Sequence, residues 1–192
     1  MQELKDRIVK EGKVLPGNII KVDGFLNHRI DTELMDHIAE EFGKHFNMDE
    51  VTMILTAEAS GIALSAIVAH HFHKPMIFAK KAKSDNIEGG LYQSDIFSYT
   101  YKKKVTLLVS KEWISSDDKI LIIDDFMANG EAMRGLCDIV KAAGATLVGI
   151  GCAVEKGFQG GGDRLRAAGV NLKSLAIIES AEPGNIVFRG ED

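Results

Sequence analysis

Short apolar runs rich in β-branched residues alternate along this chain with stretches of helical periodicity, and this alternation limits the possible folds. Strands are expected at Val51–Thr56, Met76–Ala79, Lys119–Asp124, Ala145–Val154 and Leu172–Ile178, after a short extended run at Asn18–Val22. Helices are expected at residues 2–12, 32–46, 62–72, 131–143 and 163–168. Strands separated by helices form βαβ units, whose strands run parallel. The sequence therefore predicts an α/β fold with a mostly parallel central sheet flanked by helices.

Composition and charge exclude several other classes of protein. The 192 residues are 45% hydrophobic, which suits one globular domain with a sizeable core. A net charge of −5 argues against nucleic acid as a partner, because such binding depends on clustered positive charge. No apolar run is long enough for a membrane span, and the charged N-terminus does not resemble a signal peptide. Cys137 and Cys152 lack metal-ligand spacing, so we expect free thiols in a reducing cytoplasm.

The segment 80–116 breaks the alternation of strands and helices. It is basic, contains glycine and aromatic residues, and is long for a connection inside a compact domain. Two alternating runs, Asp95–Tyr101 and Val105–Val109, predict a β-hairpin. Long connections of this kind are often functional, so we expect residues from about 82 to 116 to form a flexible lid.

The stretch from Ile120 to Met133 carries the strongest chemical signal. Four apolar residues end in Asp124 and Asp125, and a small-residue loop containing Gly130 then opens a helix. Ligands of parallel α/β sheets bind at the carboxyl ends of the strands, and the N-terminus of a helix there binds anions. Carboxylates repel phosphate but accept hydrogen bonds from sugar hydroxyls, and they also suit a magnesium ion. Together these features predict a site for a sugar phosphate.

This stretch resembles the motif with which type I phosphoribosyltransferases bind phosphoribosyl pyrophosphate (PRPP). Further segments extend the resemblance over residues 3–189 and point to the xanthine branch of the family: Lys21–His28, Glu58–Gly61, Ala79–Lys81, Ala128–Ala132 and Glu155–Gln159. The resemblance implies the type I phosphoribosyltransferase fold in one domain, residues 1–192, with an N-terminal hood at about residues 1–30 and the lid described above.

The resemblance also implies roles for particular residues. Asp124 and Asp125 would face the ribose hydroxyls, and Lys81 would approach the pyrophosphate, within its own subunit or across the interface of a homodimer. PRPP would be bound by two loops, which contain Glu58, Ala59 and Ser60 and Ala128, Asn129, Gly130, Glu131 and Ala132. The base would contact Ile20, Asn27 and Lys156. Magnesium would arrive with PRPP, and we predict no dedicated set of protein ligands for it.

Two glycine-containing stretches depart from familiar patterns. Many type I enzymes bind phosphate through threonine hydroxyls, but the corresponding positions here are Asn129 and Ala132. Backbone amides must therefore do more of the phosphate binding. Gly160-Gly-Gly162 lacks the strand–helix context of a dinucleotide-binding loop, and we interpret it as a flexible turn.

The implied activity is the transfer of a phosphoribosyl group from PRPP to xanthine, which gives xanthosine monophosphate (XMP) and pyrophosphate in purine salvage. Lys156 can only donate hydrogen bonds, which favours oxopurines over adenine. The amide of Asn27 can donate or accept, so guanine or hypoxanthine stays open as the substrate. A regulator of the same fold that senses PRPP or purines without turnover is a further alternative, although the chain has no room for an added DNA-binding domain.

Overall fold

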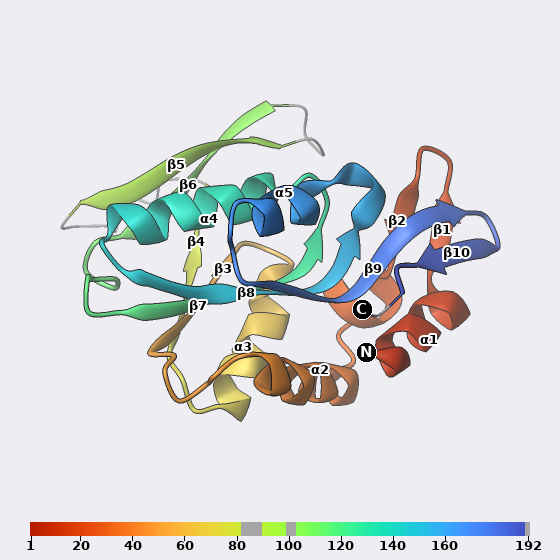
Figure 1. Cartoon of the computed structure of the whole chain (residues 1–192), viewed down its shortest axis with the longest axis horizontal. Helices are drawn as coiled ribbons and strands as arrows, with labels where there is room; N and C mark the ends of the chain where they lie inside the picture. The colour runs from red at the N-terminus through yellow and green to blue at the C-terminus, as the bar shows by residue number, and fades with distance from the viewer. Residues whose placement is uncertain (82–89, 99–102, 191–192) are drawn as a thin grey trace.

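The computed structural model describes residues 1–81, 90–98 and 103–190, and its centre is a six-stranded sheet (Figure 1). The strands lie in the order β10-β9-β8-β7-β3-β4. Their bounds are β3 Met53–Ala57, β4 Met76–Ala79, β7 Lys119–Met127, β8 Thr146–Lys156, β9 Leu172–Glu182 and β10 Asn185–Phe188. All neighbours are parallel except β10, which pairs with β9 in the antiparallel direction. The predicted parallel sheet is confirmed, and β10 is an addition that the sequence did not predict.

Helices cover both faces of this sheet. On one face lie α1 (Gln2–Glu11), α2 (Thr32–His45) and α3 (Gly61–His71), and on the other lie α4 (Glu131–Ala142) and α5 (Gly161–Ala167) (Figure 1). Successive side chains of a strand point to opposite faces, and β7 shows the consequence. Its Leu121 and Ile123 pack with α2 and α3, while Ile120 and Ile122 pack with α4. None of the helices in the described part of the chain is long and apolar enough to cross a membrane.

A β-hairpin packs on the outer side of α4, at the top of the view in Figure 1. Its strands, β5 (Leu91–Ser98) and β6 (Lys103–Ser110), pair in the antiparallel direction, which confirms the predicted hairpin. Ile96 and Leu107 are buried against Gly135 of α4, which has no side chain to keep them away. Of the predicted lid, 82–116, residues 82–89 and 99–102 lie outside the described residues, and its flexibility stays a prediction.

The predicted hood is a small unit at one end of the sheet. It contains β1 (Lys13–Leu15) and β2 (Ile19–Lys21), which pair with each other, and a π-helix at Asp23–Asn27. The Lys156 ammonium at the end of β8 donates a hydrogen bond to the carbonyl of Asn18 in the turn between β1 and β2 (3.1 Å). The hood is thereby held over the carboxyl end of the sheet.

Candidate active site

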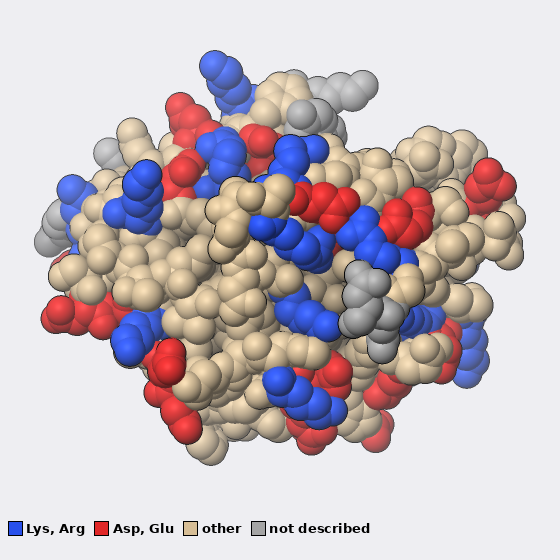
Figure 2. Space-filling model, in the orientation of Figure 1, with Lys and Arg blue, Asp and Glu red and all other residues tan. Residues whose placement is uncertain are grey.

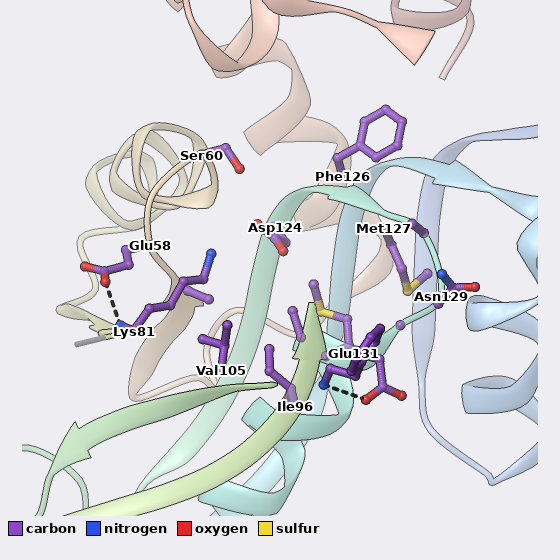
Figure 3. A pocket seen from close by; sticks show the side chains of 16 residues that line it. Glu58, Ser60, Lys81, Ile96, Val105, Asp124, Phe126, Met127, Asn129 and Glu131 are labelled. Atoms are coloured by element: carbon purple, nitrogen blue, oxygen red, sulfur yellow. Dashed lines mark hydrogen bonds between the residues drawn. The ribbon is translucent and has the colours of Figure 1, made fainter. Parts of the chain in front are cut away.

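A cavity of about 220 Å³ opens at the carboxyl ends of β3, β4 and β7 (Figure 3). Because these strands are parallel neighbours, the loops that follow them meet at one edge of the sheet. The cavity is lined by nine of the residues that the sequence singled out, namely Glu58, Ser60, Lys81, Asp124, Ala128, Asn129, Gly130, Glu131 and Ala132. The two loops expected to bind PRPP therefore face a common space.

The loop 128–132, which we call the phosphate loop, joins β7 to α4. Gly130 has a φ of 76°, a left-handed conformation that glycine adopts without steric cost, and α4 begins at the next residue. The first amide groups of a helix have no partners inside it, so they can bind an anion. Burial alone would raise the pKa of Glu131, but hydrogen bonds from Arg134 and the Phe97 amide outweigh it and lower this pKa. Its carboxylate is therefore tied to the hairpin side of the cavity.

The loop after β3 forms the opposite wall. The Glu58 carboxylate accepts a hydrogen bond from the backbone N–H of Lys81 (2.6 Å), which joins the ends of β3 and β4 (Figure 3). The Lys81 side chain extends into the cavity, where it can meet an anion (Figure 3). The Glu58–Ala59 peptide is cis, and Ala59 itself does not line the cavity.

The two adjacent aspartates do not share one environment. The sequence predicted that the strand ends at Asp124, but β7 continues to Met127, so that prediction of the boundary was wrong. Neighbouring residues inside a strand point to opposite faces. Asp124 accordingly lines the cavity, while the nearly inaccessible Asp125 accepts a hydrogen bond from the side-chain amide of Asn27 (2.9 Å). Only one of the two carboxylates faces the space between the PRPP loops.

Burial raises the pKa of Asp124 well above its usual value, and the neighbouring charge of Asp125 adds to this effect. There is no room for a side chain at Gly61, the first residue of α3, because a Cβ atom at this position would collide with both Asp124 and Thr56. The hydroxyl of Thr56 is buried and has no hydrogen-bond partner among the described residues. Thr56 lies one residue before the end of β3, and the sequence predicted it as the start of the pyrophosphate loop without a role for its hydroxyl.

The three residues expected to contact a base lie apart from this cavity, on the hood side. Ile20 is buried, and Asn27 is held by Asp125. Burial lowers the pKa of Lys156, whose ammonium lies 5.5 Å from the centre of the Phe126 ring. Phe126 also lines the cavity and so connects the two regions (Figure 3). Phe126 was not among the residues predicted from the sequence, although an aromatic residue directly after two aspartates was a usable signal.

Candidate metal ligands are not clustered in the described part of the chain. Within residues 1–81, 90–98 and 103–190, no three His, Cys, Asp or Glu residues are grouped so that they could hold a metal ion. A divalent cation at the cavity would have to bring most of its ligands with it, as a cation bound to a diphosphate does.

The chain is similar to known proteins in sequence and in fold. Residues 25–168 match the model of the phosphoribosyl transferase domain. The chain is 52% identical to a xanthine phosphoribosyltransferase of Lachnoclostridium phytofermentans, with all of both chains covered. It is 50% identical to one of Bifidobacterium adolescentis, which covers 98% of this chain and 100% of the relative.

Solved structures of lower identity share the fold. An adenine phosphoribosyltransferase of Rhodothermus marinus superposes with a TM-score of 0.74 at 20% identity, covering 93% of this chain and 100% of the other. The adenine phosphoribosyltransferase of Trypanosoma brucei, in complex with AMP, pyrophosphate and ribose-5-phosphate, superposes with a TM-score of 0.72 at 22% identity. The match covers 91% of this chain and 79% of the other. The chain described here belongs to the phosphoribosyl transferase domain family and has the type I fold of these enzymes.

Proposed function

We propose that this protein transfers the 5-phosphoribosyl group of PRPP to xanthine and releases pyrophosphate, forming XMP in purine salvage. The observation that carries the proposal is the cavity in which Asp124 lies between the phosphate loop and the loop that contains Glu58 and Ser60. The relatives that are about half identical over the whole chain support xanthine as the base.

PRPP fits this cavity by its chemistry. The 5′-phosphate would bind the amides of the phosphate loop, the ribose hydroxyls would donate to Asp124, and the pyrophosphate would bind between residues 58–60 and Lys81. Magnesium bound to PRPP would neutralise part of the pyrophosphate charge. As pyrophosphate leaves, positive charge develops at C1′ and the purine nitrogen attacks from the opposite face. The protein would act by orientation and by electrostatic stabilisation rather than by forming a covalent intermediate.

The base would bind between the hood and Phe126. Lys156 would donate to an oxygen of the purine, which disfavours adenine because an amino group there would leave both donors unpaired. The side-chain nitrogen of Asn27 donates to the Asp125 carboxylate, and this contact fixes the orientation of the Asn27 amide. Asp125 would thus contribute to base recognition through Asn27, while Asp124 binds the ribose.

We further propose that the protein is a cytoplasmic homodimer. Both cysteines are free thiols, which suits a reducing compartment. Phe78 on the edge strand β4 and Trp113 are large apolar side chains with exposed surface, which a subunit contact would cover. Light scattering after gel filtration would measure the assembly, and a monomeric mass would contradict this part of the proposal.

The decisive experiment is a purine panel. Purified protein, PRPP and Mg²⁺ are combined with xanthine, guanine, hypoxanthine or adenine, and the release of pyrophosphate is followed. The proposal expects the highest kcat/KM for xanthine. A higher value for guanine or hypoxanthine would replace the base assignment and keep the PRPP site. Binding of PRPP without turnover of any base would instead favour a regulator.

A further inference from the structure

The glycine triplet 160–162 packs against the back of the phosphate loop. The sequence analysis interpreted it as a flexible turn, but Gly161 and Gly162 are buried residues at the start of α5. A Cβ atom on Gly161 would lie 2.6 Å from the nitrogen of Gly130 and would also collide with the carbonyl of Ala128. The backbone of α5 is therefore in direct contact with the backbone of the phosphate loop, which only glycine permits.

A side chain of the same helix holds the loop at a second point. The Arg164 guanidinium donates to the carbonyl of Asn129 (3.0 Å) and to the carbonyl of Gln159 (3.4 Å). Because a trans peptide is planar, its N–H points opposite to its carbonyl. The Arg164 contact with the Asn129 carbonyl therefore also sets the direction of the Gly130 N–H, one of the amides of the phosphate loop.

The start of α5 is itself anchored to the sheet. The buried Glu155 carboxylate of β8 accepts hydrogen bonds from Arg166 (2.6 Å and 3.1 Å) and from Ser174. Gly162 packs directly against this carboxylate. Basic and acidic side chains lie side by side in the upper middle of Figure 2, where Figure 1 places α5. Arg189 also pairs with Asp163 of α5. A helix fixed in this way can act as a rigid support.

We propose that the segment Gly160–Arg164 positions the phosphate loop, with Gly161 and Arg164 as its positioning residues. The inference rests on the proposed function, since it assigns the 5′-phosphate of PRPP to that loop. The need for a support follows from the sequence of the loop. Ala132 offers the phosphate no side-chain donor and Asn129 only its amide NH2, so affinity depends largely on backbone amides, whose directions a neighbouring segment can set.

The test compares two ligands that use different ends of the site. Calorimetry measures the binding of ribose 5-phosphate and of pyrophosphate to Arg164→Met and to Gly161→Ala. We expect each variant to bind ribose 5-phosphate roughly tenfold more weakly, because Arg164→Met loses a charge-assisted hydrogen bond to the loop and Gly161→Ala displaces the loop backbone. Both variants should bind pyrophosphate as the unchanged protein does. In turnover, KM for PRPP should rise by a similar factor while kcat changes less.

Three controls keep the test specific. Lys141→Met removes an exposed positive charge from the far end of α4, and Gly24→Ala adds a Cβ where nothing lies within 4 Å. Both should bind the two ligands normally. Arg164→Lys keeps the charge without the planar guanidinium, so we expect it to restore only part of the affinity. Thermal unfolding identifies any variant whose fold is weakened.

The outcomes separate this inference from the proposed function. If Gly161→Ala binds ribose 5-phosphate normally while Arg164→Met does not, then Arg164 acts through its charge and the positioning role is overturned. Equal weakening of both ligands would point to a general structural effect and would also overturn it. If the unchanged protein binds neither ligand and turns over no purine, the proposed function itself fails, whatever the variants do.

Discussion

At the scale of single residues, Asp124 is subject to two opposing demands. A buried carboxylate beside a second carboxylate is costly when it is ionised, and the raised pKa of Asp124 expresses that cost. The proposed role nevertheless requires Asp124 to accept hydrogen bonds from the ribose hydroxyls at this buried position. Gly61 and Thr56 crowd the same carboxylate, so its position is set by packing as well as by charge. The Asp124 carboxylate should therefore help to bind the ribose while it lowers the free energy of unfolding.

The substitution Asp124→Asn tests this trade-off. A folded-state pKa above the unfolded value means that the folded protein binds the proton more tightly, so stability falls as pH rises through the folded pKa. The amide cannot ionise, and Asp124→Asn should therefore raise the free energy of unfolding at pH 7, measured with urea. Losing charged acceptors for the ribose should lower kcat/KM for PRPP by about 100-fold. The exposed Asp117→Asn should change neither quantity, and a destabilised Asp124→Asn would contradict the argument.

Lys156 offers a second test, through pH. Burial lowers its pKa from the ordinary 10.5, so the ammonium is lost at a lower pH than for an exposed lysine. Activity with xanthine should therefore decline on the alkaline side earlier in the unchanged protein than in Lys156→Arg, which stays charged. Xanthine ionises equally in both assays, so the difference between the two profiles reports on the side chain. If activity declined over the same alkaline pH range in both proteins, the charge of residue 156 would not matter for activity.

Removing the amine altogether should have a larger effect on the base than on PRPP. In Lys156→Met, we expect kcat/KM for xanthine to fall by about 100-fold, the cost of one charge-assisted hydrogen bond to a buried oxygen. KM for PRPP should change little, because Lys156 lies outside the cavity that holds the phosphate loop. Steady-state kinetics with each substrate varied in turn measure both quantities. A large rise in KM for PRPP would contradict the separation of the two regions.

At the scale of secondary-structure elements, the prediction from sequence succeeded where the pattern was local. The five parallel strands and their helices follow from apolar runs and helical spacing, and so does the position of the phosphate loop. The end of β7 did not follow, because two aspartates after four apolar residues resemble a strand end. In the structure, Asp124 and Phe126 pair with Cys152 and Val154 of β8, and this pairing extends the strand.

Contacts between distant segments were beyond the reach of such reasoning. The hydrogen bond from Asn27 to Asp125 spans 98 positions of sequence. Similarly, the packing of Gly161 on the phosphate loop depends on how α5 returns to the sheet, which no local pattern encodes. The resemblance could therefore name the residues of the site and divide them between PRPP and the base, while it could not place Asp125 against Asn27 or Gly161 behind the phosphate loop.

The contact between α4 and the hairpin allows a test at this scale. A Cβ atom on Gly135 would lie 2.6 Å from Ile96 and 3.0 Å from Leu107, both buried. Gly135→Ala should therefore push the hairpin from α4, and overpacking of this kind costs about 1–3 kcal/mol of unfolding free energy. Because Ile96 and Phe97 line the cavity, KM for PRPP should rise as well. Urea unfolding and kinetics measure both effects. An alanine that is neutral or stabilising, through its helix propensity, would show that the hairpin is loosely held.

At the scale of the whole molecule, the candidate site joins two parts that are far apart in sequence. The hood contributes Asn27 and the carbonyl of Asn18, and the sheet contributes Asp125 and Lys156. The Arg7 guanidinium of α1 also pairs with Asp31 at the start of α2, which links the hood to the helices beneath the sheet. A product that contains both the base and the 5′-phosphate would contact the hood and the phosphate loop at once.

XMP should therefore stabilise the protein more than its separate parts do. A ligand that binds only the folded state adds about 2.7 kcal/mol at a concentration 100 times its Kd, and linking two binding groups lowers Kd. At equal concentrations, XMP should raise Tm more than ribose 5-phosphate and xanthine added together. In Lys156→Met the increase caused by XMP should shrink, while that caused by ribose 5-phosphate should not change. If XMP raised the Tm of the unchanged protein no more than ribose 5-phosphate alone does, the hood would not take part in binding the nucleotide.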